Sequence, residues 1–191
     1  DFDKKELQEK IEKLKISNDD IEKEIDRNLE LLKQFEFEQK LEEAIDDLKK
    51  KKEKEEKLSD LSTKKENELN KLEEKQKSNI ADFEKLKEKL NQLNKLKKEL
   101  PKSNPLNTEK IEEEIQNSME NSLKQLEKNK RKQASKSQQL SSKKLSELEE
   151  KLNEQKQKES MEQQIENIET LRQILENLIY FSVEEENLML T

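Results

Sequence analysis

The side chains of this chain that could take part in chemistry are carboxylates, cations, amides and hydroxyls, because the sequence contains no His, no Cys and no Gly. Without His and Cys, the usual zinc sites and the Ser-His or Cys-His nucleophile pairs are excluded. Without Gly, the glycine-rich loops that cradle phosphates are excluded. Carboxylates are abundant, but acid-base catalysis needs them in a water-poor cleft, which a thin helical rod does not offer. We therefore expect no enzyme, no cofactor and no metal site.

The most basic stretch of the chain is residues 127–139, in which Ala134 is the one apolar side chain. Its cations could contact a phosphate backbone or an acidic partner: Lys128, Lys130, Arg131, Lys132 and Lys136. The stretch has no aromatic residue for base stacking, so sequence-selective binding of nucleic acid is not expected. The alternative interpretation is a solvated, poorly paired segment. Overall, 40 basic and 47 acidic residues are interleaved, and the net charge of −7 argues against a dedicated nucleic-acid or membrane binder.

The elements that must position these side chains are predicted to be helices. Hydrophobic residues make up 28% of the 191 residues, too few for a compact domain with a large core of its own. The leucines recur at spacings of three and four, which predicts an all-α fold built as a long coiled-coil rod. No apolar run approaches the roughly 18 residues of a membrane span, and no signal peptide is visible. We expect an intracellular protein, either cytoplasmic or nuclear.

Residues 1–100 are predicted to form the first arm of the rod. Its apolar seam is Leu7, Ile11, Leu14, Ile21, Ile25, Leu32 and Phe35, and it continues after a shift of phase at Leu41, Ile45 and Leu48. Asn18 and Asn28 fall on the seam, either to fix its register or as tolerated polar substitutions. Residues 49–57 carry no apolar side chain, so this part of the arm has the weakest packing against a partner helix.

Beyond residues 49–57 the apolar period changes. The pairs Leu58/Leu61, Leu69/Leu72 and Ile80/Phe83 recur every eleven residues, which predicts local straightening or a slight right-handed winding.

The two prolines, Pro101 and Pro105, interrupt any continuous helix and define a hinge at residues 101–107. The second helix could begin at Asn104, with Pro105 as its first helical residue, or one turn later at Asn107 or Thr108. The hinge could reverse the chain into an antiparallel hairpin or leave an elbow in an extended rod. We favour the elbow with a separate partner chain, because the two arms do not carry matching seams.

Residues 108–179 are predicted to form the second arm, and its apolar density rises from Met161 onward. The stripe there is wider than a two-stranded seam needs, which indicates a site where several helices meet or where the coil docks on a globular partner. Residues 180–191 are predicted to be a short strand-like tail, the start of a small domain or a docking segment. The candidate partner-binding residues are Ile165, Ile168, Leu171, Leu175, Leu178, Ile179, Tyr180 and Phe181.

The segment Pro101-Lys102-Ser103-Asn104-Pro105-Leu106, with Leu152-Asn153-Glu154-Gln155 farther on, resembles the proline-interrupted coil of the centromere protein K family. The order of long helix, proline break, long helix and short tail also resembles coiled-coil subunits of kinetochore and spindle assemblies. That resemblance implies paired rods that lead into small globular ends.

From this layout we expect a non-enzymatic scaffold that pairs with a partner helix, as a homo- or hetero-oligomer, and spaces or tethers the components of a larger assembly. The favoured setting is the cytoskeleton, the spindle or chromosome segregation, with no small-molecule substrate. The alternatives are a membrane-tethering or nucleic-acid-associated binding module, and a monomeric charged-helix spacer.

Overall fold

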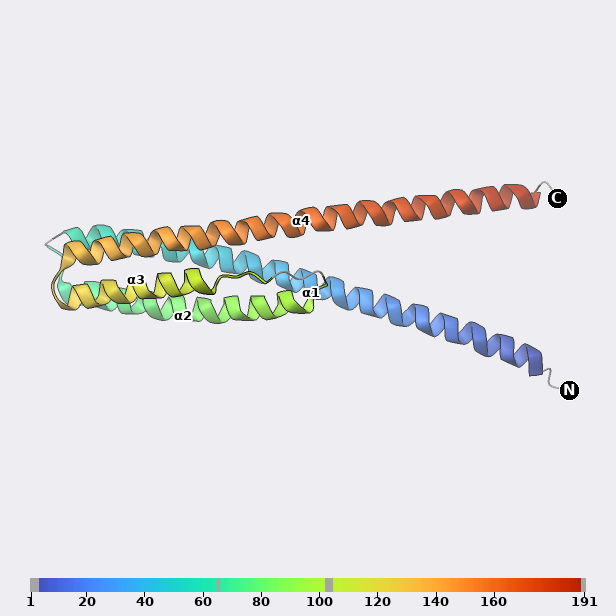
Figure 1. Ribbon diagram of the computed structural model, residues 1–191, viewed down its shortest axis with the longest axis horizontal. Coiled ribbons are helices and arrows are strands. Elements are labelled where there is room, and N and C mark those ends of the chain that lie inside the picture. Colours follow the sequence, from blue (N-terminus) through green and yellow to red (C-terminus); the bar gives the residue numbers. More distant parts are fainter. Residues whose placement is uncertain (1–3, 65, 102–104, 190–191) are drawn as a thin grey trace. The chain divides into compact units, whose positions relative to one another are not determined.

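The computed structural model describes residues 4–64, 66–101 and 105–189, and the side chains of 21–64, 66–101, 105–173, 175, 176, 178 and 179. Within these ranges every regular element is an α-helix (Figure 1), so the predicted all-α class is confirmed there. The helices are α1 (Lys4–Thr63), α2 (Leu69–Glu99), α3 (Glu109–Glu127) and α4 (Arg131–Met189). The chain divides into two compact units, Asp1–Glu149 and Glu150–Thr191.

The first unit contains an antiparallel four-helix bundle, whose helices follow one another up, down, up and down (Figure 1). Polar contacts between neighbouring helices join residues whose numbers rise along one helix as they fall along the other. The contacts are Asp47 with Lys89 and Lys54 with Asp82 for α1 and α2, Gln76 with Ser122 and Lys87 with Gln116 for α2 and α3, and Lys52 with Glu149 and Ser59 with Ser135 for α1 and α4, at 2.6–2.8 Å. Glu114 with Lys144, at 2.7 Å, joins α3 and α4.

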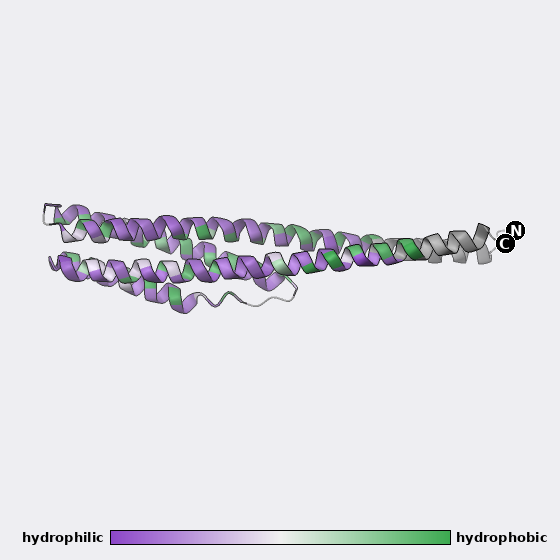
Figure 2. Cartoon of the chain, turned by 90° about the horizontal axis from the view of Figure 1, so that it is seen from above, coloured by the Kyte–Doolittle hydropathy of each residue, from purple (hydrophilic) through white to green (hydrophobic). Residues whose placement is uncertain are grey.

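The core of the bundle is a column of apolar side chains from one face of each helix, and Figure 2 shows how these alternate with hydrophilic residues along the chain. Because each of the four helices turns only a narrow face inward, the low apolar content does not prevent a core. Each buried leucine contributes roughly 1.5–3 kcal/mol. The large side chains that are fully buried are Phe37, Leu41, Leu48, Leu58, Leu72, Phe83, Leu86, Leu90, Leu93, Ile115, Met119 and Leu126.

Two helix breaks without proline or glycine separate α1 from α2 and α3 from α4, where the sequence predicted continuous arms. The first break lies between Thr63 and Leu69, inside the eleven-residue repeat, and the Nδ2 of Asn67 donates to the carbonyl oxygen of Leu61 at 2.8 Å. At the second break, Asn129 adopts a left-handed φ of 52°. The N–H of Lys130 then donates to the oxygen of Gln125 at 2.7 Å, which closes the helix end as a glycine usually does.

The loop that carries the two prolines reverses the chain instead of leaving it extended. The helix α2 ends at Glu99 and α3 begins at Glu109, so of the two predicted starts the structure has the later one, after Thr108. Pro101 and Pro105 flank residues 102–104, which lie outside the described residues. The elbow that the sequence favoured is replaced by an antiparallel hairpin.

Asn94 of α2 holds this loop against the bundle. Its Oδ1 accepts from the N–H of Leu106 at 3.1 Å, and its Nδ2 donates to Glu109 Oε1 at 3.2 Å. Leu100 and Leu106 are both buried at the end of the bundle. Burial of these two leucines favours the reversed chain over an open elbow.

The second unit consists of the later turns of α4, which stay helical through Met189. The strand-like tail predicted from residue 180 onward is therefore wrong as far as residue 189, and residues 190 and 191 lie outside the described part. The segment contains no proline or glycine, the two residues least favourable in a helix interior, which agrees with its helical structure. In the described part of the chain, no helix has an apolar stretch long enough to cross a membrane.

Candidate functional site

The candidate partner-binding residues of the second unit form an exposed apolar stripe along α4, which we call the α4 stripe. Its exposed fractions range from 56% for Ile179 to 65% for Leu171, whereas the bundle core residues Leu90 and Leu93 are at 1% or less. The spacings of three and four place its members along one side of the helix. Its members are Met161, Ile165, Ile168, Leu171, Leu175, Leu178 and Ile179. The side chains of Tyr180 and Phe181 lie outside the described residues.

Acidic residues border the α4 stripe. Glu162, Glu169 and Glu176 recur every seven residues, which sets them along one edge of the apolar face. Between residues 161 and 179 there are four glutamates and one basic residue, Arg172, whose Nε lies 3.7 Å from Glu176 Oε1. A helix that covers this face is favoured electrostatically when it presents basic residues along that edge.

A second exposed apolar face lies on α1 before the bundle begins. Ile21, Ile25, Leu32 and Phe35 are between 53% and 64% exposed. Because Lys33 pairs with Glu99 at 2.9 Å, at the last residue of α2, the preceding turns of α1 extend past the end of α2.

The apolar spacing of the sequence changes phase between this face and the seam at Leu41, Ile45 and Leu48, and the structure explains the change. At 3.6 residues per turn, the face that begins at Ile21 lies roughly opposite the core face that begins at Phe37. The core face packs inside the bundle, where Phe37 and Leu41 are both fully buried. The earlier face is thus not a continuation of the core.

Between the apolar layers of the bundle lies a layer of polar side chains, which we call the polar layer. Glu55 Oε1 accepts hydrogen bonds from Gln76 Nε2 at 3.0 Å and from Asn79 Nδ2 at 2.7 Å. The Oε1 of Gln76 accepts from Ser122 Oγ at 2.7 Å and from Gln138 Nε2 at 2.9 Å. All four helices therefore contribute to one connected network.

The carboxyl group of Glu55 is fully buried, and burial raises its pKa to about 7, although the hydrogen bonds from Asn79 and Gln76 oppose that rise. Its second oxygen, Oε2, has no hydrogen-bond partner among the described residues, and neither has Gln138 Oε1. On one side, an apolar cluster with one residue from each helix closes the layer: Leu58, Leu72, Leu126 and Ala134.

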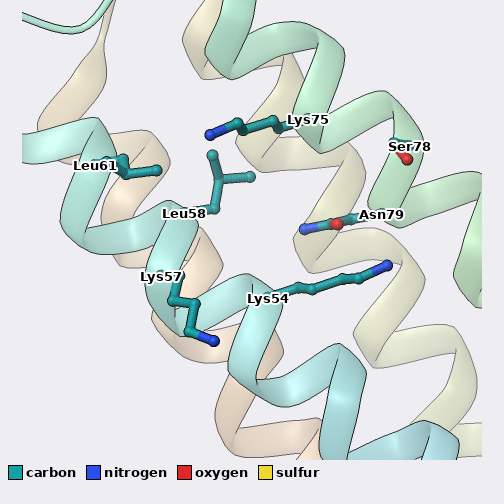
Figure 3. A pocket seen from close by; sticks show the side chains of 7 residues that line it. All are labelled: Lys54, Lys57, Leu58, Leu61, Lys75, Ser78 and Asn79. Atoms are coloured by element: carbon teal, nitrogen blue, oxygen red, sulfur yellow. The ribbon is translucent and has the colours of Figure 1, made fainter.

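A pocket of about 300 Å³ opens between α1 and α2 beside the polar layer (Figure 3). Leu58 and Leu61 form its apolar part, and three lysines surround it. Lys54 pairs with Asp82 at 2.7 Å and Lys57 with Glu53 at 3.5 Å, whereas Lys75 has no acidic partner among the residues that the structure describes. Asn79 lines the pocket and also donates to Glu55, so it separates the buried carboxyl group from solvent.

The basic residues considered for phosphate contact lie at the end of the bundle where α3 turns into α4. Lys128, Lys130, Lys132 and Lys136 are exposed there. Arg131 is used structurally, because its guanidinium group donates to the carbonyl oxygens of Lys64 at 3.0 Å and Asn67 at 2.7 Å. These bonds tie the second helix break to the first. Contact of the lysines with phosphate stays a prediction.

The polar layer was missed in the sequence, although a signal for it exists. Residues 49–57 and 127–139 hold almost no apolar side chain, so apolar spacing alone indicates no seam there. If polar residues are also allowed on the seam, Glu55 and Gln138 within these stretches lie three or four residues from a buried apolar side chain, and so do Gln76, Asn79 and Ser122 elsewhere.

Among the described residues no cluster of three or more acidic side chains is placed to hold a metal ion. Comparison of the chain with protein families, with curated proteins and with solved structures finds no match. The resemblance to centromere protein K and to other kinetochore coils therefore stays a prediction.

Proposed function

We propose that this chain is a non-enzymatic helical scaffold, which pairs through exposed apolar helix faces with a partner helix and tethers components of a larger assembly. The observation that carries the proposal is the α4 stripe, in which seven apolar residues at helical spacing are more than half exposed. Soluble chains rarely expose a contiguous apolar face of this kind unless it binds something. A row of anchors at spacings of three and four is what helix-on-helix recognition requires.

The α1 face of Ile21, Ile25, Leu32 and Phe35 supports the same proposal independently. It lies roughly opposite the core face of α1, so the bundle itself cannot cover it by a small adjustment. The bundle would serve as the folded body that carries the α1 face. The favoured setting is an assembly of the cytoskeleton, the spindle or the chromosome-segregation machinery, in the cytoplasm or nucleus.

The test is the solution mass of the full chain, measured by light scattering over a range of concentrations, together with binding of a synthetic helical peptide. The peptide repeats the apolar spacing of the α4 stripe and carries lysines along the edge that would face Glu162, Glu169 and Glu176. The variant Leu171→Ser/Leu175→Ser/Leu178→Ser removes three anchors. The control Gln163→Ser/Gln173→Ser changes polar residues of the same helix.

We expect either concentration-dependent self-association or peptide binding, lost in the triple variant and kept in the control. A chain that stays monomeric and binds no peptide would contradict the proposal, as would association that the triple variant leaves intact. Binding of duplex DNA that weakens steeply with salt would instead favour the nucleic-acid alternative and the exposed lysines.

A further inference from the structure

The carboxyl group of Glu55 lacks the counter-charge that a buried ion needs. An ionised carboxylate inside a protein is costly unless a cation or several donors compensate it. The groups that join it in the polar layer are Gln76 and Asn79 from α2, Ser122 from α3 and Gln138 from α4, and none of these titrates.

The charged residues nearest to Glu55 along α1 interact with other groups. Lys51, one turn before it, interacts with Asp82 and Asp47. Lys52 pairs with Glu149 at 2.8 Å and Lys54 with Asp82 at 2.7 Å. Glu56 accepts from Ser142 Oγ at 3.0 Å. Lys75 of α2 lines the pocket together with Asn79 and the α1 residues Lys54 and Lys57, and its ammonium group stands at the pocket rather than in the layer (Figure 3).

The hydrogen bonds of the layer leave one position open for a proton. Because Gln76 Oε1 already accepts from Ser122 and Gln138, its amide nitrogen must point to Glu55 Oε1. Glu55 Oε1 thereby accepts two bonds and Oε2 none. The carbonyl of Gln138 in the same network also lacks a donor. A carboxylic acid, protonated on Oε2, supplies a donor to a layer that is short of donors.

We propose that the polar layer is a proton-binding site, in which Glu55 holds a proton on Oε2 and so ties the packing of all four helices to pH. The reaction is uptake of one proton from solvent by the carboxylate, with no other bond made or broken. The raised pKa of Glu55 agrees with this assignment, since burial is its first cause. The side chain of Asn79 lies between the carboxyl group of Glu55 and the pocket, which is open to solvent. This site is independent of the α4 stripe and of the scaffold role.

The direct test is a pH titration of the full chain with ¹³C-labelled glutamate, in which the side-chain carboxyl resonance of Glu55 is followed by NMR. We expect its midpoint near neutral pH. A midpoint close to 4.5, the ordinary value for glutamate, would overturn the proposal. This measurement needs no variant, so it holds even if a substitution of Glu55 prevents folding.

The second test compares Glu55→Gln with Glu53→Gln, a matched change at an exposed position two residues away. The folding equilibrium constant of the wild type should fall on the order of 10²-fold between pH 5 and pH 8, because the folded chain gives up its proton there. The Glu55→Gln chain should lose most of this slope and Glu53→Gln should keep it. An unchanged slope in Glu55→Gln would contradict the assignment.

A metal cation bound by Glu55 Oε2 is the rival explanation, and it gives a different result. Potassium, sodium or magnesium chloride added at pH 8, at matched ionic strength, would then stabilise the wild type in an ion-specific manner but not Glu55→Gln. The same ions would keep the carboxyl resonance in its ionised position. Either result would overturn the proton assignment.

Discussion

The core of the bundle and the α4 stripe are built from the same residue types at the same spacing, yet one is covered and the other is exposed. Leu86, Leu90 and Leu93 of α2 are at most 1% exposed, whereas Leu171, Leu175 and Leu178 of α4 are between 58% and 65% exposed. Apolar residues at spacings of three and four determine which face of a helix is apolar. They do not determine what covers that face.

The largest expected effect comes from removing a side chain from the covered region. Phe83→Ala should destabilise the bundle by about 3–5 kcal/mol, because it removes buried contacts and leaves a cavity. The matched change in the exposed region, Leu171→Ala, should alter stability by less than about 0.5 kcal/mol. Urea unfolding followed by circular dichroism measures both. Equal losses in the two variants would show that the α4 stripe is covered in the folded chain.

The next effect is a dependence of stability on pH that originates in the bundle. The pKa of Glu55 in the folded chain is about 7, above its ordinary value of 4.5. The stabilisation by its proton is therefore complete below pH 4.5 and is lost as the pH rises through 7, by about 3 kcal/mol in total. Stability should be level again above pH 8. Unfolding curves at a series of pH values test this, and a stability that rises between pH 5 and 8 would contradict it.

A smaller effect is expected at the left-handed residue that ends α3. Asn129→Ala should cost about 1 kcal/mol, because alanine tolerates a φ of 52° less well than asparagine does. Asn129→Gly should be neutral or stabilising for the same reason. Thermal unfolding of the two variants side by side checks the order. If alanine were the more stable, the turn would not depend on the left-handed conformation.

The smallest effect is expected from the ion pairs on the bundle surface. Lys54 and Asp82 are 2.7 Å apart, and the Lys54 ammonium group lowers the pKa of Asp82. Both side chains are partly exposed, so a double-mutant cycle with Lys54→Ala and Asp82→Ala should give a coupling below about 1 kcal/mol that shrinks in high salt. A larger coupling that resists salt would place this pair among the main supports of the bundle.

The sequence predicts the helical class and a helix interruption at Pro101 and Pro105, and the described part of the chain has both. It also identifies the apolar residues of the α4 stripe, whose role in binding a partner stays a prediction. It fails at the two breaks near Asn67 and Asn129, because neither contains proline or glycine and asparagine is common throughout the chain. It also fails to distinguish a hairpin from an elbow at residues 101–107. That choice depends on tertiary contacts, the burial of Leu106 and its bond to Asn94, which no local pattern encodes.

The polar layer could be predicted only in part. Gln76 and Asn79 continue the spacing of the α2 seam between Leu72 and Phe83, which is a readable signal. Glu55 also keeps the seam spacing, three residues before Leu58, but it lies in a run of lysines and glutamates that equally suits a solvated helix, so the sequence does not show that it is buried. Only the partners from the other helices show that this one carboxyl group is buried while its neighbours Glu53 and Lys54 reach solvent.

The most direct test of the contrast between the covered and the exposed regions is amide hydrogen exchange of the monomeric full chain, resolved along the sequence by mass spectrometry. We expect slow exchange for the helix turns around Leu41, Leu90 and Ile115 and fast exchange across residues 161–179. The lysine-edged peptide should slow exchange at 161–179 and leave the bundle unchanged. Equal protection of both regions in the monomer would contradict this contrast, because the α4 stripe would then already be covered.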